Sequence, residues 1–246
     1  MTNHYGMRSR WRAIARGDPG SPHRVSKMKD LSLSSAELGG HDSQSPARQR
    51  GNRSTRVPEI LEAAIRVFAS EGNVGFTQRR VAAEAQIRLG TLQHYFGSRD
   101  TLLIATIEEV ARRYLEQYRS ISSDASLSAS ARLEAVLDDV FDALTDSDNV
   151  VSPFAFECWC LAEHQPAVRD LMVEVSKEFQ ALFSGLVAQI NDTLPVEECR
   201  LRGALLYSHW EGLIVFLRRS GPSGFDVAAF RIATKVVWKA ISVAPQ

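Results

Sequence analysis

Apolar residues recur with helical spacing in three short stretches of the first half of the chain. In the first stretch the apolar positions fall at i, i+3, i+4 and i+7, which predicts one buried helix face: Leu61, Ala64, Ile65 and Phe68. Pro58 suits the first helical position, and Gly72 suits the left-handed residue that closes a helix. We therefore expect a helix over 58–72, with Glu62 and Arg66 paired across one turn of its solvent face.

Two shorter helices are predicted to follow. The Thr77 hydroxyl can cap the second helix, whose first turn carries Arg79 and Arg80. The helix dipole disfavours cations there by roughly 0.3–1 kcal/mol each, so each arginine is either solvated or faces an external anion such as a DNA phosphate. The third helix, 89–95, is only about two turns long, and its remaining side chains face outward or flank a groove: Thr91, Gln93, His94 and Tyr95. Such a helix is a poor core element and a good probe of a DNA major groove.

Longer helical patterns fill the rest of the chain, and no strand pattern competes with them. The expected ranges are 99–119, 131–144, 153–163, 166–190, 197–219 and 226–242. The fold class is therefore all-α, with about nine helices. The last two helices are apolar on more than one face, in the rows Leu201, Ala204, Leu205 and Ser208, then Phe230, Ala233, Val237 and Ile241. A monomer does not easily cover so much apolar surface.

Residues 56–105 resemble the DNA-binding domain of the TetR family of bacterial transcriptional regulators. The resemblance rests on an ordered set of matches: Phe68, Gly72, Gly75-Phe76-Thr77, Val81-Ala82, Ala85, Gly90-Thr91-Leu92, His94-Tyr95-Phe96, Arg99, Leu102 and Leu103. It implies a three-helix helix-turn-helix domain over 53–103. It further implies a helical domain over 104–246 that binds an effector and forms a homodimer through the last two long helices. Thr77, Tyr95 and Arg99 match family positions that contact phosphates.

The chain departs from the family pattern at three positions around the short helix. Gln86 replaces the usual turn glycine, so the turn must tolerate a side chain. Arg88 replaces the usual serine cap, which implies a weaker cap and an added cation. Gln93 replaces an aromatic residue and can pair with adenine N6 and N7, which makes it the first candidate for base readout. The complete predicted DNA site is Thr77, Gln78, Arg79, Arg88, Leu89, Gly90, Thr91, Gln93, His94, Tyr95 and Arg99.

Composition and charge place limits on the partners. The 246-residue chain is 44% hydrophobic and 24% charged, which is ordinary for a globular protein. Its net charge is zero, but residues 1–56 carry +7, residues 57–103 carry 0 and residues 104–246 carry −7. Residues 1–52 have few large apolar residues, which predicts a disordered basic extension. The sequence has neither an apolar run of ~20 residues nor a signal peptide, so we expect a cytoplasmic protein with no membrane partner.

The three cysteines, Cys158, Cys160 and Cys199, suit a reducing compartment. Cys158 and Cys160 are two apart on a predicted helix and diverge, and the ligand set that His164 would join is incomplete. We therefore expect no metal and no cofactor, and we expect the cysteines to act as small buried hydrophobic residues.

Aromatic and acidic residues of the C-terminal part form a candidate effector site. Aromatic faces beside a carboxylate can hold a cation, although the same aromatic residues can simply fill the core. Residues 150–220 loosely resemble the C-terminal domain of the betaine-pathway repressors, which respond to choline. The candidate effector residues are Tyr114, Phe154, Glu157, Trp159, Phe183, Tyr207, Trp210 and Glu211.

Together these features predict a dimeric repressor that a small molecule releases from double-stranded operator DNA. Two alternatives stay open: an activator or effector-independent DNA binder, and an all-α enzyme. The enzyme is the weaker alternative because the sequence has no nucleophile elbow, HExxH motif, phosphate loop or paired carboxylates with an evident role.

Overall fold

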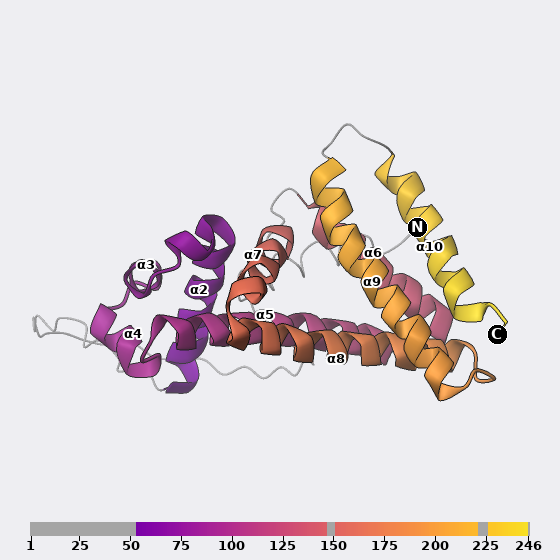
Figure 1. Ribbon diagram of the computed structural model, residues 1–246, viewed down its shortest axis with the longest axis horizontal. Coiled ribbons are helices and arrows are strands. Elements are labelled where there is room, and N and C mark those ends of the chain that lie inside the picture. Colours follow the sequence, from indigo (N-terminus) through magenta and orange to yellow (C-terminus); the bar gives the residue numbers. More distant parts are fainter. Residues whose placement is uncertain (1–52, 147–150, 221–225, 246) are drawn as a thin grey trace, which may run out of the picture.

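The computed structural model describes residues 53–146, 151–220 and 226–245, and in these residues it contains nine helices and no strand (Figure 1). The prediction of an all-α fold is confirmed. The predicted disorder of 1–52 lies outside the described residues. The helices are α2 (Arg53–Gly75), α3 (Gln78–Glu84), α4 (Leu89–Tyr95), α5 (Arg99–Ser122), α6 (Ala129–Thr145), α7 (Val151–His164), α8 (Pro166–Ile190), α9 (Val196–Ser220) and α10 (Val227–Val243).

Helices α2, α3 and α4 form a head at one end of the molecule (Figure 1). The predicted apolar face of α2 is buried in the core of this head, and Phe68 contacts Phe76 edge-on with ring centroids 5.4 Å apart. Gly72 has the predicted positive φ, 62°, but its ψ of −168° lies outside the left-handed helical region and puts a kink inside α2. The predicted start of the helix is wrong, because α2 begins at Arg53 and Pro58 lies inside it. Proline has no N–H to donate to the carbonyl four positions earlier. That carbonyl lies in the exposed first turn of α2, where water can bind it instead.

The predicted pair between Glu62 and Arg66 does not form, because neighbouring helices supply other partners. Glu62 forms an ion pair with Arg113 of α5, and both side chains are only 15% exposed. Arg66 instead donates to Glu84 of α3 at 3.0 Å. Glu62 therefore ties α2 to α5, and Arg66 ties α2 to α3 within the head.

The long helices α5 and α8 run side by side along the molecule and connect the head to the opposite end, where α9 and α10 lie (Figure 1). Helix α7 lies between the head and the remaining helices, which we call the C-terminal body. Phe154 and Cys158 of α7 belong to the core of the head. A second core lies among α5, α6, α8, α9 and α10. Since α7 contacts both α2 and α8, movement of α7 would displace both the head and the second core.

The apolar surface predicted on the last two helices is present, with one correction. Leu201 and Leu205 of α9 are 56% and 48% exposed. On α10, however, Phe230 and Ile241 are half-buried against the core rather than exposed with Val237. The α10 face left open also contains three further residues, Ile232, Val236 and Val243. The predicted row therefore mixes two faces, because Ala233 and Val237 are exposed as predicted and Phe230 and Ile241 lie toward the core.

Other expectations from composition can be compared with the described ranges. Helices within these ranges are too short or too polar to cross a bilayer. The same residues contain no group of three or more His, Cys, Asp and Glu side chains that could hold a metal ion. All three cysteines are free thiols; Cys158 and Cys199 are buried as predicted, but Cys160 is exposed. Cys160 lies two positions from Cys158 on α7, and i,i+2 residues face different sides of a helix.

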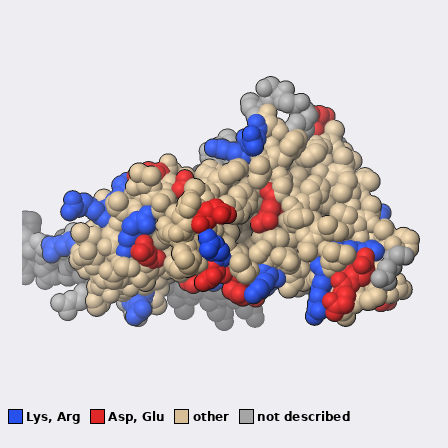
Figure 2. Space-filling view, in the orientation of Figure 1, with Lys and Arg blue, Asp and Glu red and all other residues tan. Residues whose placement is uncertain are grey.

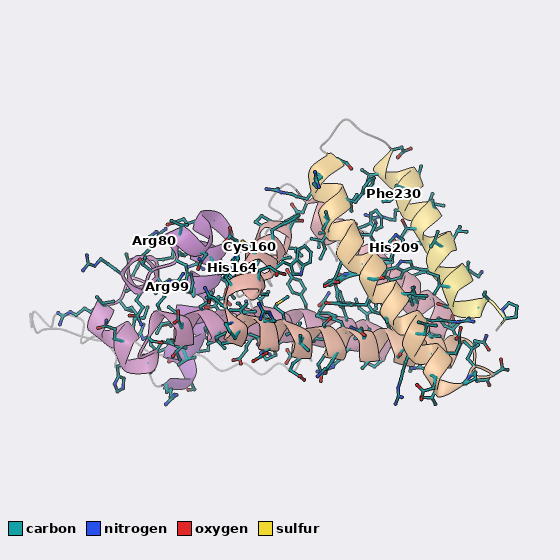
Figure 3. All side chains as sticks on the ribbon, in the orientation of Figure 1. Arg80, Arg99, Cys160, His164, His209 and Phe230 are labelled. Atoms are coloured by element: carbon teal, nitrogen blue, oxygen red, sulfur yellow. The ribbon has the colours of Figure 1, made fainter. Side chains whose placement is uncertain are left out.

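A histidine joins α9 to α10 and predicts a pH dependence of stability. The buried Trp238 indole donates to Nδ1 of His209 at 3.0 Å, between the two helices (Figure 3). Burial lowers the pKa of His209, so the fold favours the neutral acceptor form. The stability contributed by this group is complete above about pH 6.5, the usual pKa, and is lost as the pH falls from there toward the lower folded value. We expect the urea midpoint of the wild type to decrease when the pH is lowered from 7.5 to 5.5. The decrease should be smaller in His209→Gln. Equal losses in both proteins would contradict this assignment.

Candidate DNA-binding surface and effector cavity

Helix α4 presents polar side chains to solvent at the outer end of the head. Its boundaries, Leu89–Tyr95, match the predicted helix. Leu92 and Phe96 are buried beneath it, whereas Thr91, Gln93 and His94 are exposed. A Cβ atom added at Gly90 would meet no protein atom within 4 Å, so packing inside the head does not require glycine there. This opening leaves room for an external backbone to approach α4 closely.

The turn between α3 and α4 fixes the direction of α4. Gln86 has φ 54° and is the one non-glycine residue with positive φ in the described chain. The Ile87 N–H donates to the Ala82 carbonyl at 2.9 Å and closes the turn. The turn thus adopts the left-handed conformation that glycine would adopt without strain, and it accommodates a glutamine side chain, as predicted.

The start of α4 lacks a side-chain cap, which gives a prediction about stability. Arg88 occupies the cap position but makes no capping hydrogen bond. A serine there could accept an N–H of the first turn, so Arg88→Ser is expected to raise the free energy of unfolding by about 1 kcal/mol. The thermal midpoint should rise by about 2–4 °C. Unchanged thermal unfolding of the variant would show that the missing cap is not a source of instability.

Side chains at the start of α3 cap that helix and connect it to α4. The Thr77 hydroxyl accepts the Arg80 N–H at 3.1 Å, which confirms the predicted cap. Gln78 donates through Nε2 to the Phe96 carbonyl at 2.8 Å, and its Oε1 lies 3.5 Å from Nε2 of Gln93. Gln93 therefore extends from the surface beside an anchored glutamine. The sequence placed Gln78 in the site without revealing this anchoring role.

The two arginines of α3 have different environments. Arg80 donates to Glu71 at 2.7 Å and to Glu84 at 3.0 Å, and these hydrogen bonds, led by that of Glu84, raise its pKa. Arg79 and Arg88 are exposed and have no acidic partner among the residues that the structure describes. Figure 2 shows Lys and Arg side chains projecting from this end of the molecule. The free positive charge next to α4 therefore comes from Arg79 and Arg88, and Arg80 belongs to an internal ion-pair network.

Arg99 lies at the start of α5 with its guanidinium directed into the turn between α2 and α3 (Figure 3). Its Nε donates to the Phe76 carbonyl at 2.8 Å, and its Nη2 donates to the Asn73 carbonyl at 2.8 Å and also to Oδ1 of Asn73. The guanidinium also lies 5.7 Å from the centroid of the Phe76 ring. Arg99 thus joins α5 to the segment from which α3 begins.

Glu157 of α7 holds the same turn from the other side. Its carboxylate accepts the Asn73 N–H at 2.8 Å, and a Cβ atom at Gly72 would lie 2.8 Å from its Oε1. The sequence assigned Glu157 to the effector site, but the structure places its carboxylate at the head. Asn73 is consequently bonded to both α5 and α7.

An apolar cavity of about 100 Å³ lies between α5, α6, α7, α8 and α9, close to the head. Three of the predicted effector residues line it: Tyr114, Phe154 and Trp210. The other five do not: Glu157, Trp159, Phe183, Tyr207 and Glu211. Two aromatic residues that the sequence reading did not select, Tyr118 and Phe179, also form part of the wall. Only the tertiary arrangement separates the wall of a cavity from a filled core.

A polar two-turn helix held outward by two supporting helices, at one end of an all-α molecule, defines a helix-turn-helix regulator that binds DNA. The model of the bacterial regulatory proteins of the tetR family matches residues 60–113. The chain is 32% identical over 193 residues to the HTH-type transcriptional regulator BetI of Burkholderia thailandensis, covering 76% of this chain and 94% of that protein. The chain belongs to the TetR family of bacterial transcriptional regulators.

Solved structures agree on the fold. A TetR transcription regulator from Haloarcula marismortui superposes with a TM-score of 0.63 at 17% identity, over 78% of this chain and 98% of that one. The fatty acid degradation regulator FadR from Bacillus halodurans gives a TM-score of 0.61 at 19% identity, over 80% and 99%. Since the tetR family and the relative BetI are transcriptional regulators, the alternative of an all-α enzyme is rejected.

Proposed function

We propose that this regulator is a homodimeric repressor that a small molecule releases from its operator. The observation that carries the proposal is the outer surface of α4, where Thr91, Gln93 and His94 are exposed and Gly90 leaves an open approach. Exposed amide and hydroxyl groups on a short helix suit hydrogen bonding to base edges in the major groove. Beneath α4, the buried side chains of Leu92 and Phe96 hold the helix against the core of the head.

Roles can be assigned to the residues around α4. Gln93 and Thr91 read bases, and Arg88 lies near enough to α4 to join them. Phosphate contacts come from Thr77 and Arg79 at the start of α3 and from His94 and Tyr95 at the end of α4. Leu89 and Gln78 position α4 rather than read bases, because both are half-buried. Arg99, whose donors serve the turn between α2 and α3, acts as a positioning residue.

The partner surface for dimerisation is the open apolar face of α9 and α10. Leu201, Leu205, Ile232 and Val236 lie on it, and the last two are 65% and 64% exposed. Burial of such side chains is worth about 1.5–3 kcal/mol each, enough for a few of them to drive association. A two-fold dimer presents two α4 helices to half-sites about one DNA turn, ~34 Å, apart.

Release by a ligand requires that the cavity be coupled to the head. Two of its walls are connected to α2 or the turn after it. Arg113 in the wall is bound to Glu62 of α2, and Phe154 lies on α7 one turn from Glu157, which holds Asn73. A ligand that moves α5 away from α7 would therefore shift the head. A small shift in each protomer changes the distance between the two α4 helices, which then no longer matches the half-sites.

Fluorescence anisotropy with a labelled DNA fragment from upstream of the protein's own coding sequence tests this function. Affinity should exceed that for a scrambled fragment by at least a thousand-fold, with two chains bound per site, and should fall steeply with added salt. Equal affinity for both fragments, or one chain per site, would contradict the proposal.

A further inference from the structure

The wall of the cavity is almost entirely hydrocarbon and aromatic. Apart from Arg113, its residues are apolar or aromatic, including Ile107, Val140 and Phe179. An engineered apolar cavity of about 150 Å³ binds benzene, so a cavity of about 100 Å³ approaches the size of one aromatic ring. Met172, with its flexible thioether chain, also lines the cavity and allows modest expansion.

The charges near the cavity are already paired with one another. Arg113 donates to Glu62 and, through Nε, to Glu109 at 2.7 Å. An anionic ligand would have to displace one of these carboxylates, and it would lose its hydration on entering an apolar site.

A cationic ligand lacks a carboxylate partner in the wall. Glu157 is turned away to Asn73, and Glu211 lies outside the wall, where burial raises its pKa and so favours the neutral acid. Asp139 is 2% exposed and is not part of the wall; Gln117 donates to its Oδ1 at 3.2 Å. The aromatic faces alone would have to offset the desolvation of a cation.

One wall residue carries an unsatisfied donor. The Nε1 atom of Trp210 is buried and makes no hydrogen bond, although the Tyr118 hydroxyl lies near enough to interact with it. The indole is held in place by stacking on Phe179 and Tyr207, at centroid distances of 5.1 and 5.4 Å. A buried N–H without an acceptor is destabilising, and a ligand oxygen placed against it would remove that cost.

We propose that this cavity takes a neutral, predominantly apolar ligand of about one aromatic ring, with an oxygen acceptor for the Trp210 indole N–H. The inference rests on the proposed function for the location of the effector, and it names the chemical class. It differs from the choline-like cation that the sequence suggested, because the wall supplies aromatic faces without a carboxylate.

A charge series of ring compounds of similar size tests the class directly. Isothermal titration calorimetry of the full chain would use anisole, ethylbenzene, benzylammonium and benzoate, with choline as a further cation. Anisole and ethylbenzene should bind, and each charged compound should bind at least ten-fold more weakly. Tighter or equal binding of benzylammonium, choline or benzoate would overturn the proposal, as would failure of both neutral compounds to bind.

The acceptor is tested with Trp210→Phe, which removes the indole N–H. The affinity ratio of anisole to ethylbenzene, which differ in one ether oxygen, should be two- to ten-fold higher in the wild type than in the variant. The ratio cancels any general change of cavity size. An unchanged ratio would overturn the assignment of the acceptor.

The same titrations repeated on the protein–DNA complex separate the two proposals. Release of DNA by the neutral compounds supports both. Binding of these compounds with unchanged DNA affinity would contradict ligand release and leave the ligand class supported.

Discussion

Replacing Arg99 with alanine is expected to lower the free energy of unfolding by about 2–4 kcal/mol and to weaken operator binding about 10- to 100-fold. The variant removes the donors to the Phe76 and Asn73 carbonyls, and Phe76 is completely buried. A buried carbonyl without a donor destabilises the turn from which α3 starts, and α4 loses its fixed orientation. Urea unfolding and anisotropy below the unfolding transition measure the two effects.

Arg79→Ala is the matched control, because Arg79 is exposed and has no acidic partner in the described part of the chain. A phosphate contact contributes about 0.9 to the slope of log affinity against log salt and little to stability. We therefore expect Arg79→Ala to reduce the slope by about one and to leave unfolding unchanged. Arg99→Ala should show the opposite pattern. A reduced slope with unchanged stability in Arg99→Ala would instead make Arg99 a phosphate contact, as the family resemblance implies.

Replacing Gly203 with alanine is expected to destabilise the C-terminal body by about 2–3 kcal/mol. Gly203 of α9 faces α8 so closely that an added Cβ would lie 2.6 Å from the Ser184 nitrogen and 2.7 Å from its Oγ. The backbone of α8 cannot move away without disturbing its packing, and Ser184 Oγ also donates to the Cys199 carbonyl at 2.9 Å. The thermal midpoint should fall by roughly 4–12 °C.

Gly185→Ala provides the control on the neighbouring residue of α8. A Cβ there would meet no atom within 4 Å, so only the helix propensity changes. That variant should be more stable than the wild type by up to about 1 kcal/mol. If both alanine variants unfold at the wild-type temperature, the close approach of α8 and α9 does not limit stability.

The local features of the fold were predictable because they depend on neighbouring residues in the sequence. The apolar period gave the extents of α4 and α8, and Thr77 caps α3 as expected. The positive φ of Gln86 also follows from local turn geometry. Periodicity is only partly right at α10, where Val237 is exposed as predicted and Phe230 packs against the core.

The parts that were not predictable depend on residues far apart in the chain. Glu62 lies 51 positions from Arg113, and Glu157 lies 84 positions from Asn73, so sequence proximity suggested other partners or roles for both acids. The difference between Arg79 and Arg80 likewise arises from Glu71 and Glu84, which fold against only one of them. The separation of cavity-lining from core aromatics has the same origin. Such pairings need the tertiary arrangement.

The central claim, that the exposed face of α4 receives the operator, is tested most directly by the triple variant Thr91→Ala, Gln93→Ala and His94→Ala. All three residues are exposed and alanine favours helix, so the fold should persist; Thr77 is left intact because it caps α3. The matched control removes the exposed pair Glu174 and Lys177 of α8. Anisotropy with the upstream fragment should show at least a hundred-fold loss of affinity for the triple variant and none for the control. Wild-type affinity in a folded triple variant would contradict the account.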